Sequence, residues 1–143
     1  MKKLFSFLAV SVLCSVAIFA QDVNGKYILD KENSNITKYI SETADSNGTE
    51  LATVLILDDK TRDDVSSFLY DKAVPTELVI KNDKMTFVFP DKTEVSSNIE
   101  INKESKNPSL TVLDEKGSDN MDIIIKSDKV QKLDWHGIVY VKK

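Results

Sequence analysis

Cysteine and histidine are each present only once in this chain, as Cys14 and His136. A lone histidine does not build a histidine metal site, and a general base needs an orienting partner. The chain also lacks a glycine-rich phosphate loop, a Gly-x-Ser-x-Gly nucleophile turn and a paired-cysteine metal motif. These scarcities weigh against an enzyme, and the sequence predicts no cofactor and no metal.

Long apolar runs are scarce too, and the clearest stands at the N-terminus. Two lysines precede an uncharged, mostly apolar stretch that ends at Ala20, where a polar sequence begins. This order predicts a signal peptide over 1–20. The apolar stretch is too short for a transmembrane helix, which needs about 20 apolar residues. Cleavage after Ala17 and an uncleaved N-terminal anchor are the alternatives. We expect an exported protein, periplasmic or secreted, with one β-rich domain over 21–143 and no membrane span after cleavage.

Cys14 suggests another alternative, a lipoprotein acylated at that cysteine. Leu13 is bulky where the lipoprotein peptidase requires a small residue, and 15–20 stays apolar where a lipoprotein has a polar tether. If Cys14 leaves with the signal, the mature chain has no disulfide, no thiolate nucleophile and no thiolate metal site.

The charge of the mature chain limits its partners. Removing the two lysines of the signal leaves 17 basic and 23 acidic residues, so the net charge changes from −4 to −6. This charge argues against nucleic acid or an anionic membrane surface as a partner. The remaining 123 residues support one domain.

Short apolar runs separated by turn clusters recur along the mature chain. Apolar and polar residues alternate with a period of two in several of them, as expected for strands with one buried side. The three prolines fall between the runs. The pattern predicts a mostly β fold, an antiparallel meander closing into a small barrel, with a β-sandwich as the alternative. The runs are 27–29, 36–43, 51–57, 78–80, 85–89, 95–101, 110–113, 121–125, 130–135 and 138–141.

One stretch departs from the strand pattern. A threonine N-cap and acidic residues open it, and Val65, Phe68 and Leu69 then recur at i, i+3 and i+4. We predict one short helix near 62–71. The preceding run 51–57 is apolar on both faces, so we expect the helix to bury Phe68 and Leu69 against it. A dimer interface is the other possibility.

Four aromatic residues are weak candidates for lining a ligand pocket: Phe87, Phe89, Trp135 and Tyr140. Packing in the core is the alternative role for each. His136, beside a glycine, is interpreted as a turn or surface histidine, whereas acids gathered around it would favour a hydrolase.

Acidic residues cluster at 58–64 and again at 114–122. Neither order matches a calcium-binding loop. We interpret them as a helix start and a polar turn, with a weak cation site as the alternative.

The segment Gly25-Lys26-Tyr27 and the final run 138–143, with its aromatic and basic residues, resemble small bacterial lipocalin-like domains. Those domains open with Gly-x-Trp, and Tyr27 takes the place of the tryptophan here. The resemblance implies a barrel that binds a small apolar molecule. We therefore expect a non-catalytic exported protein that binds a small hydrophobic ligand in the barrel mouth. The alternative is a cell-envelope or secreted protein that acts through its surface, with an envelope protein as partner.

Overall fold

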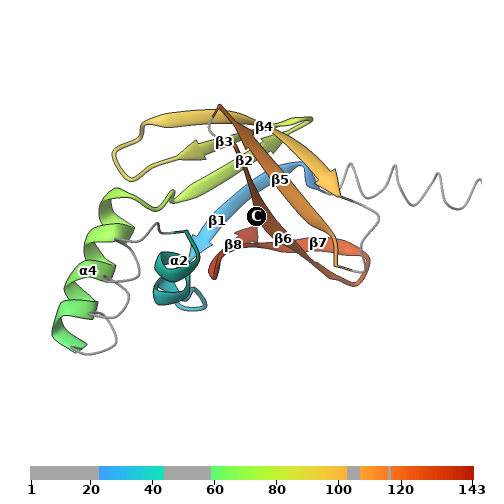
Figure 1. The fold of residues 1–143 in the computed structure, drawn as a ribbon. Coiled ribbons are helices and arrows are strands. Elements are labelled where there is room, and N and C mark those ends of the chain that lie inside the picture. The colour runs from blue at the N-terminus through green and yellow to red at the C-terminus, as the bar shows by residue number, and fades with distance from the viewer. Residues whose placement is uncertain (1–22, 44–58, 103–106, 116) are drawn as a thin grey trace, which may run out of the picture.

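A computed structural model describes residues 23–43, 59–102, 107–115 and 117–143 (Figure 1). Strands joined in sequence order form a closed barrel. Each strand pairs antiparallel with the next, and the last strand pairs with the first. The strands are β1 (Gly25–Asp30), β2 (Glu77–Lys81), β3 (Lys84–Val88), β4 (Glu94–Asn102), β5 (Ser109–Asp114), β6 (Gly117–Lys126), β7 (Lys129–Trp135) and β8 (Ile138–Lys142).

This topology confirms the predicted antiparallel meander closing into a barrel, and the sandwich alternative is wrong. The predicted signal peptide over 1–20 and the predicted strand over 51–57 lie outside the described residues. The residue range of the single domain stays a prediction.

The barrel interior is filled by side chains from every strand. Two buried tyrosines in it have partners for their hydroxyls: Tyr27 donates to the carbonyl of Val23 at 2.7 Å, and Tyr140 donates to the carbonyl of Pro75 at 2.9 Å. Among the described residues, every buried side-chain nitrogen or oxygen has a hydrogen-bond partner. The fully buried apolar side chains include Tyr27, Leu78, Met85, Leu110, Met121, Leu133, Ile138 and Tyr140.

The period-two prediction holds in most strands and fails locally in β6. Met121 and Ile123 are buried as expected, but Ile125 is exposed. The pairing of β6 with β7 shifts register between Ile124 and Ile125. A bulge of this kind turns the following side chains away from the face that the alternation assigns to them.

The segment Ile36–Thr43, expected to be a strand, is helix α2. Asn35 caps its N-terminus, because the Asn35 side-chain oxygen accepts a hydrogen bond from the backbone N–H of Lys38 at 3.0 Å. Ile36 and Ile40 lie one turn apart on the helix, and both are buried in the core. The prediction of a single helix is therefore wrong.

The predicted helix near 62–71 is confirmed as α4, Asp59–Lys72. It begins earlier than expected, so Thr61 lies within the helix and is not its N-cap. Val65 and Leu69 pack partly against the core. Phe68 is 63% exposed, which contradicts its predicted burial. Figure 1 shows α4 extending away from the strands, on the same side of the barrel as α2.

One end of the barrel carries the candidate site. The β3–β4, β5–β6 and β7–β8 turns lie at this end, and α2 follows β1 there. We call it the mouth end. The opposite end, called the far end, carries the β2–β3 and β6–β7 turns.

Candidate functional site

Three of the four predicted aromatic residues line one cavity at the mouth end. Phe87, Phe89 and Trp135 surround a space of about 260 Å³, called the mouth cavity below. Tyr140 does not reach it and is fully buried in the core. The remaining lining residues are Pro75, Val95, Ser97, Val112, Asp114 and Asp119.

Strand pairing explains why these side chains meet. Phe87 on β3 faces Val95 on β4, and Val112 on β5 faces Asp119 on β6. Each pair places two neighbouring side chains on the same side of the sheet. Trp135 is the last residue of β7, the strand next to β6, and it lines the cavity beside Asp119.

Trp135 is held between two other aromatic rings. Its ring centroid lies 6.0 Å from that of Phe87 and 5.3 Å from that of Tyr39, which meets it edge-on at 72°. Tyr39 belongs to α2, so the helix and the barrel fix the indole together. A ring packed in this way forms a rigid wall for the cavity.

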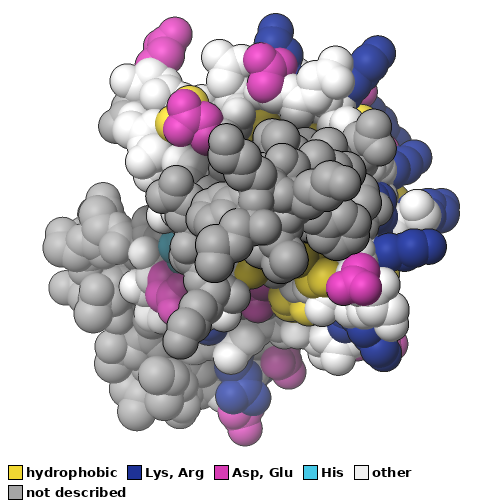
Figure 2. Space-filling model, turned by 90° about the vertical axis from the view of Figure 1, so that its right-hand side faces the viewer, with side chains coloured by type: hydrophobic (Ala, Val, Ile, Leu, Met, Phe, Trp, Pro, Cys, Tyr) yellow, Lys and Arg dark blue, Asp and Glu magenta, His cyan; other side chains and the backbone are white. Residues whose placement is uncertain are grey.

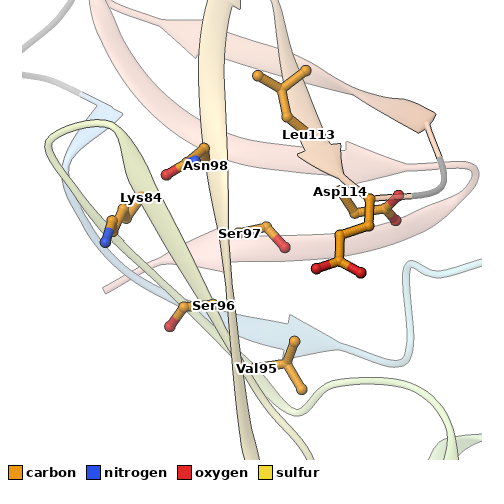
Figure 3. A pocket seen from close by; sticks show the side chains of 8 residues that line it. Lys84, Val95, Ser96, Ser97, Asn98, Leu113 and Asp114 are labelled. Atoms are coloured by element: carbon orange, nitrogen blue, oxygen red, sulfur yellow. The ribbon is translucent and has the colours of Figure 1, made fainter.

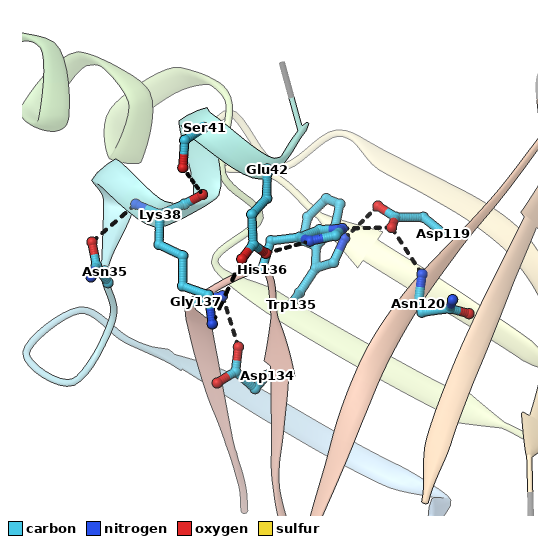
Figure 4. Close-up of polar contacts among 10 residues, drawn as sticks. All are labelled: Asn35, Lys38, Ser41, Glu42, Asp119, Asn120, Asp134, Trp135, His136 and Gly137. Carbon is cyan, nitrogen blue, oxygen red and sulfur yellow. Dashed lines mark hydrogen bonds and ion pairs between the residues drawn. The ribbon is translucent and has the colours of Figure 1, made fainter. Parts of the chain in front are cut away.

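A polar network joins the cavity to α2 (Figure 4). The indole N–H of Trp135 donates to Oδ2 of Asp119 at 2.7 Å. His136 Nε2 lies 2.6 Å from Oδ1 of Asp119, and His136 Nδ1 lies 2.9 Å from Oε2 of Glu42. When the ring is protonated, both nitrogens donate, and the imidazolium bridges β6 and α2.

The turn that carries His136 has a left-handed backbone. His136 has φ 51° and Gly137 has φ 94°, as a two-residue type I′ hairpin turn requires. The Gly137 carbonyl accepts the backbone N–H of Asn35 at 2.8 Å. A Cβ on Gly137 would lie 3.0 Å from the Asn35 carbonyl oxygen and 3.2 Å from the Lys38 side chain. The glycine therefore lets α2 approach the turn closely.

The network shifts the pKa of two of its members. Partial burial works against charge at His136, but the hydrogen bonds that its ring donates to Asp119 and Glu42 outweigh it, so its pKa is raised. Partial burial favours the neutral form of Asp119, yet the hydrogen bonds from Trp135 and His136 leave its pKa lowered. At a pH between the lowered pKa of Asp119 and the raised pKa of His136, the carboxylate is negative and the imidazole ring is positive.

An outer cleft adjoins the mouth cavity. β4 pairs with β5 only over Asn98–Asn102, so the start of β4 pairs with β3 alone. The cleft between β4 and β5 has a volume of about 780 Å³ and shares Val95, Ser97 and Asp114 with the mouth cavity. Figure 3 shows Ser97 and Asp114 on the two strands beside the opening.

Of the four aromatic residues singled out from the sequence, Phe87, Phe89 and Trp135 line the cavity and Tyr140 does not, and the sequence pattern did not point to two acids of the network. The sequence predicts a polar turn at Asp119, whereas Asp119 lies in β6 opposite Val112. The sequence predicts a strand at Glu42, whereas Glu42 lies on α2. Asn35, followed by apolar residues at 36, 39 and 40, was the available helix signal.

Acids do gather around His136, the arrangement expected to favour a hydrolase. However, each ring nitrogen already faces a carboxylate. In the described segments, no serine or threonine hydroxyl is hydrogen-bonded to His136. The ring therefore bridges the two acids, Asp119 and Glu42.

No family model, curated protein or solved structure matches this chain. Within the described ranges, no group of three or more His, Cys, Asp or Glu side chains is arranged to hold a metal ion. No helix in those ranges has the length and apolar character to cross a membrane.

Proposed function

We propose that this is a non-catalytic, exported binding protein that holds a small molecule with an apolar body in the mouth cavity. One observation carries the proposal: Phe87, Phe89 and Trp135 converge on a single cavity at the mouth end. Ligand sites are typically concave, largely apolar and equipped with a few polar groups. Ser97, Asp114 and Asp119 supply such groups here.

The size of the cavity limits the ligand. Its volume of about 260 Å³ is close to the lower end of the range for ligand pockets, roughly 300–1,000 Å³. The barrel interior offers no further room, because Tyr140 and Leu78 are fully buried in it. A single-ring molecule or a short branched chain therefore fits the site better than a long lipid does.

The barrel also supports the lipocalin-like resemblance as part of this proposal. Tyr27, of the Gly-x-Tyr segment, packs in the barrel core. The run 138–141 closes the barrel against β1. Export, to the periplasm or the exterior, rests on the predicted signal peptide.

Binding is testable with the chain's single tryptophan, since Trp135 lines the cavity. We expect the neutral single-ring probe neopentylbenzene to change Trp135 emission in a saturable way. Phe89→Ala should weaken that binding, because it removes a wall of the cavity. Phe68→Ala is the matched control, because Phe68 lies exposed on α4. Equal binding by both variants would contradict the proposal.

Native mass spectrometry of the protein purified from its own source is the complementary experiment. A co-purifying small molecule that Phe89→Ala no longer retains would identify the natural ligand. Retention of that molecule by Phe89→Ala would place it elsewhere on the protein.

The second candidate is an envelope protein that acts through its surface. It is favoured by α4, which has no buried residue and exposes Phe68 to 63%. A photo-crosslinker at position 68 should then give a discrete adduct in intact cells. The same group at exposed position 100, on β4, should not.

A further inference from the structure

We propose that pH regulates ligand binding in the mouth cavity, with the protonated ring of His136 holding the cavity wall in its binding form. The inference rests on the proposed function of the cavity and names how that same site is regulated. It is supported by the contacts of the ring, by the charges around it and by the side chains that join it to the cavity.

The imidazole ring of His136 contacts a carboxylate at each nitrogen (Figure 4). Nε2 lies 2.6 Å from Oδ1 of Asp119 on β6, and Nδ1 lies 2.9 Å from Oε2 of Glu42 on α2. The protonated ring donates to both acids, whereas the neutral ring has one N–H and one lone pair. Loss of the proton therefore leaves one carboxylate facing a lone pair, and the bridge between the barrel and α2 opens at that contact.

Charged groups from α2, β6 and β7 surround the ring. Lys38 pairs with Glu42 at 3.8 Å, so the protonated ring and Lys38 together balance the two acids. Loss of the proton leaves two acids and one cation, a net charge of −1, and this opposes deprotonation of the ring. The described titratable side chains that face the ring, its turn or the neighbouring indole are Lys38, Tyr39, Glu42, Asp119 and Asp134.

The lysines of the far end lie apart from this network. Lys126, Lys129, Lys142 and Lys143 surround one shallow hollow there. Figure 2 shows lysine and arginine side chains gathered along one edge of the face opposite the helices. Exposed charges at the other end of the barrel from α2 are screened by solvent, so they do not replace the charge that His136 loses.

Both carboxylates of the bridge support the wall of the mouth cavity. Asp119 lines the cavity and accepts the indole N–H of Trp135 at 2.7 Å. Glu42 lies on α2, whose Tyr39 packs edge-on against the same indole with ring centroids 5.3 Å apart. The closed bridge therefore holds Trp135 from the barrel and from α2 together. When the bridge opens, one of these supports weakens, and a ligand must also order the wall when it binds, which lowers its affinity.

Helix α2 stays docked in both states. Ile36 and Ile40 are buried in the core, and the backbone N–H of Asn35 donates to the Gly137 carbonyl at 2.8 Å whatever the state of the ring. The proton therefore changes how firmly the wall is held without detaching the helix. We expect an effect of roughly fivefold on affinity, at the lower end of the couplings typical of linked sites.

The test uses the neutral probe neopentylbenzene, which does not titrate, so a change of pH acts on the protein alone. Titrations followed by Trp135 fluorescence give its affinity at pH 5.5 and pH 9. We expect roughly fivefold tighter binding at pH 5.5. His136→Asn should bind the probe with one affinity at both pH values, because asparagine keeps the left-handed turn and has no proton that titrates in this range.

Glu42→Gln should also reduce the dependence on pH, since it weakens the contact with α2 and leaves the lining of the cavity unchanged. Glu100→Gln is the matched control, because it makes the same change at an exposed position of β4. It should keep the difference in affinity between pH 5.5 and pH 9.

The coupling between proton and ligand is reciprocal, so saturation with neopentylbenzene should raise the pKa of His136. His136 is the chain's only histidine, and NMR titration of its ring with and without the probe measures this directly. A histidine that only stabilises the fold would show the same pKa in both titrations.

The outcomes distinguish this inference from the proposed function. Equal affinity at both pH values in the parent protein would overturn the regulation and leave the cavity as a binding site. A dependence on pH that His136→Asn retains, or a pKa of His136 that saturation leaves unchanged, would also overturn it. Absence of binding at both pH values would overturn the proposed function and this inference together.

Discussion

Replacing His136 with asparagine removes the bridge between α2 and β6 but keeps the turn that carries it. Asparagine tolerates the left-handed backbone, and Asn-Gly is a favoured type I′ turn. Alanine at φ 51° would add a backbone cost of its own, roughly 1–2 kcal/mol. His136→Asn therefore isolates the contribution of the imidazole ring.

The magnitude follows from two contacts, to Asp119 at 2.6 Å and to Glu42 at 2.9 Å. Charge-assisted hydrogen bonds contribute roughly 1.5–3 kcal/mol where solvent is excluded. Here the side chains are 23% exposed for His136 and 42% exposed for each acid, so solvent screens them. At about 0.5–1 kcal/mol per contact, His136→Asn should lower the free energy of unfolding by about 1–2 kcal/mol. A few tenths of a kcal/mol are recovered, because Asn-Gly is a favoured type I′ turn.

The loss should depend on pH in a definite direction. The folded-state pKa of His136 is raised, so its stabilisation is fully present below its unfolded pKa of about 6.5 and disappears as pH rises through the folded value. The folded-state pKa of Asp119 is lowered, so its contribution is present above about pH 3.9 and disappears as pH falls through the folded value. The pair stabilises most between roughly pH 4 and 6.5.

Urea unfolding at pH 5.5 and pH 9, followed by circular dichroism, measures this effect. We expect His136→Asn to be less stable than the parent at pH 5.5 and the difference to shrink at pH 9. His136 is the chain's only histidine, so no second imidazole confuses the result. Glu42→Gln should reproduce part of the loss, while Glu100→Gln, on the exposed side of β4, should not. A difference that is absent, or the same at both pH values, would refute the bridge.

Three further variants test the fold around the site. Phe87→Ala should cost about 3–5 kcal/mol in urea unfolding, because the side chain is only 8% exposed; a loss below about 1 kcal/mol would be that of a surface residue. Gly137→Ala should destabilise by at least about 1 kcal/mol, because its φ is 94° and the new Cβ would lie 3.0 Å from the Asn35 carbonyl oxygen; unchanged thermal unfolding would contradict that close approach. Tyr140→Phe should cost about 1–3 kcal/mol, since it leaves the buried Pro75 carbonyl without its donor, and an unaltered midpoint in urea would count against the bond.

The barrel was predictable because its strands carry a local signal. Met85 and Phe87 share the inner face of β3, as alternation required. Asn82, with φ 59°, turns β2 into β3 between two apolar runs. Pairings between neighbours in the sequence need little more than such alternation and turn residues. Closure of β8 on β1 follows once a meander of this length curls.

Helix α2 was not predictable by the same reasoning because its composition favours a strand. Ile36, Thr37 and Ile40 are β-branched, and such residues have high strand propensity. The Asn35 cap and the burial of Ile36 and Ile40 against the barrel stabilise the helix over a strand. The cap is visible in the sequence, whereas the barrel surface that receives the helix is not.

The polar network shows why a site is harder to infer than a fold. Glu42 and His136 are 94 residues apart, and Asp119 and His136 are 17 apart, so no local pattern joins them. The network depends on α2 meeting the β7–β8 turn, a contact that Gly137 permits by lacking a side chain. Since Asp119 both lines the mouth cavity and holds His136, the stability of α2 and the charge of the cavity share one carboxylate. Any substitution at Asp119 must therefore change both the stability of α2 and the charge of the cavity. A substitution at Asp114 changes the cavity alone, and a substitution at Glu42 changes the helix contact alone.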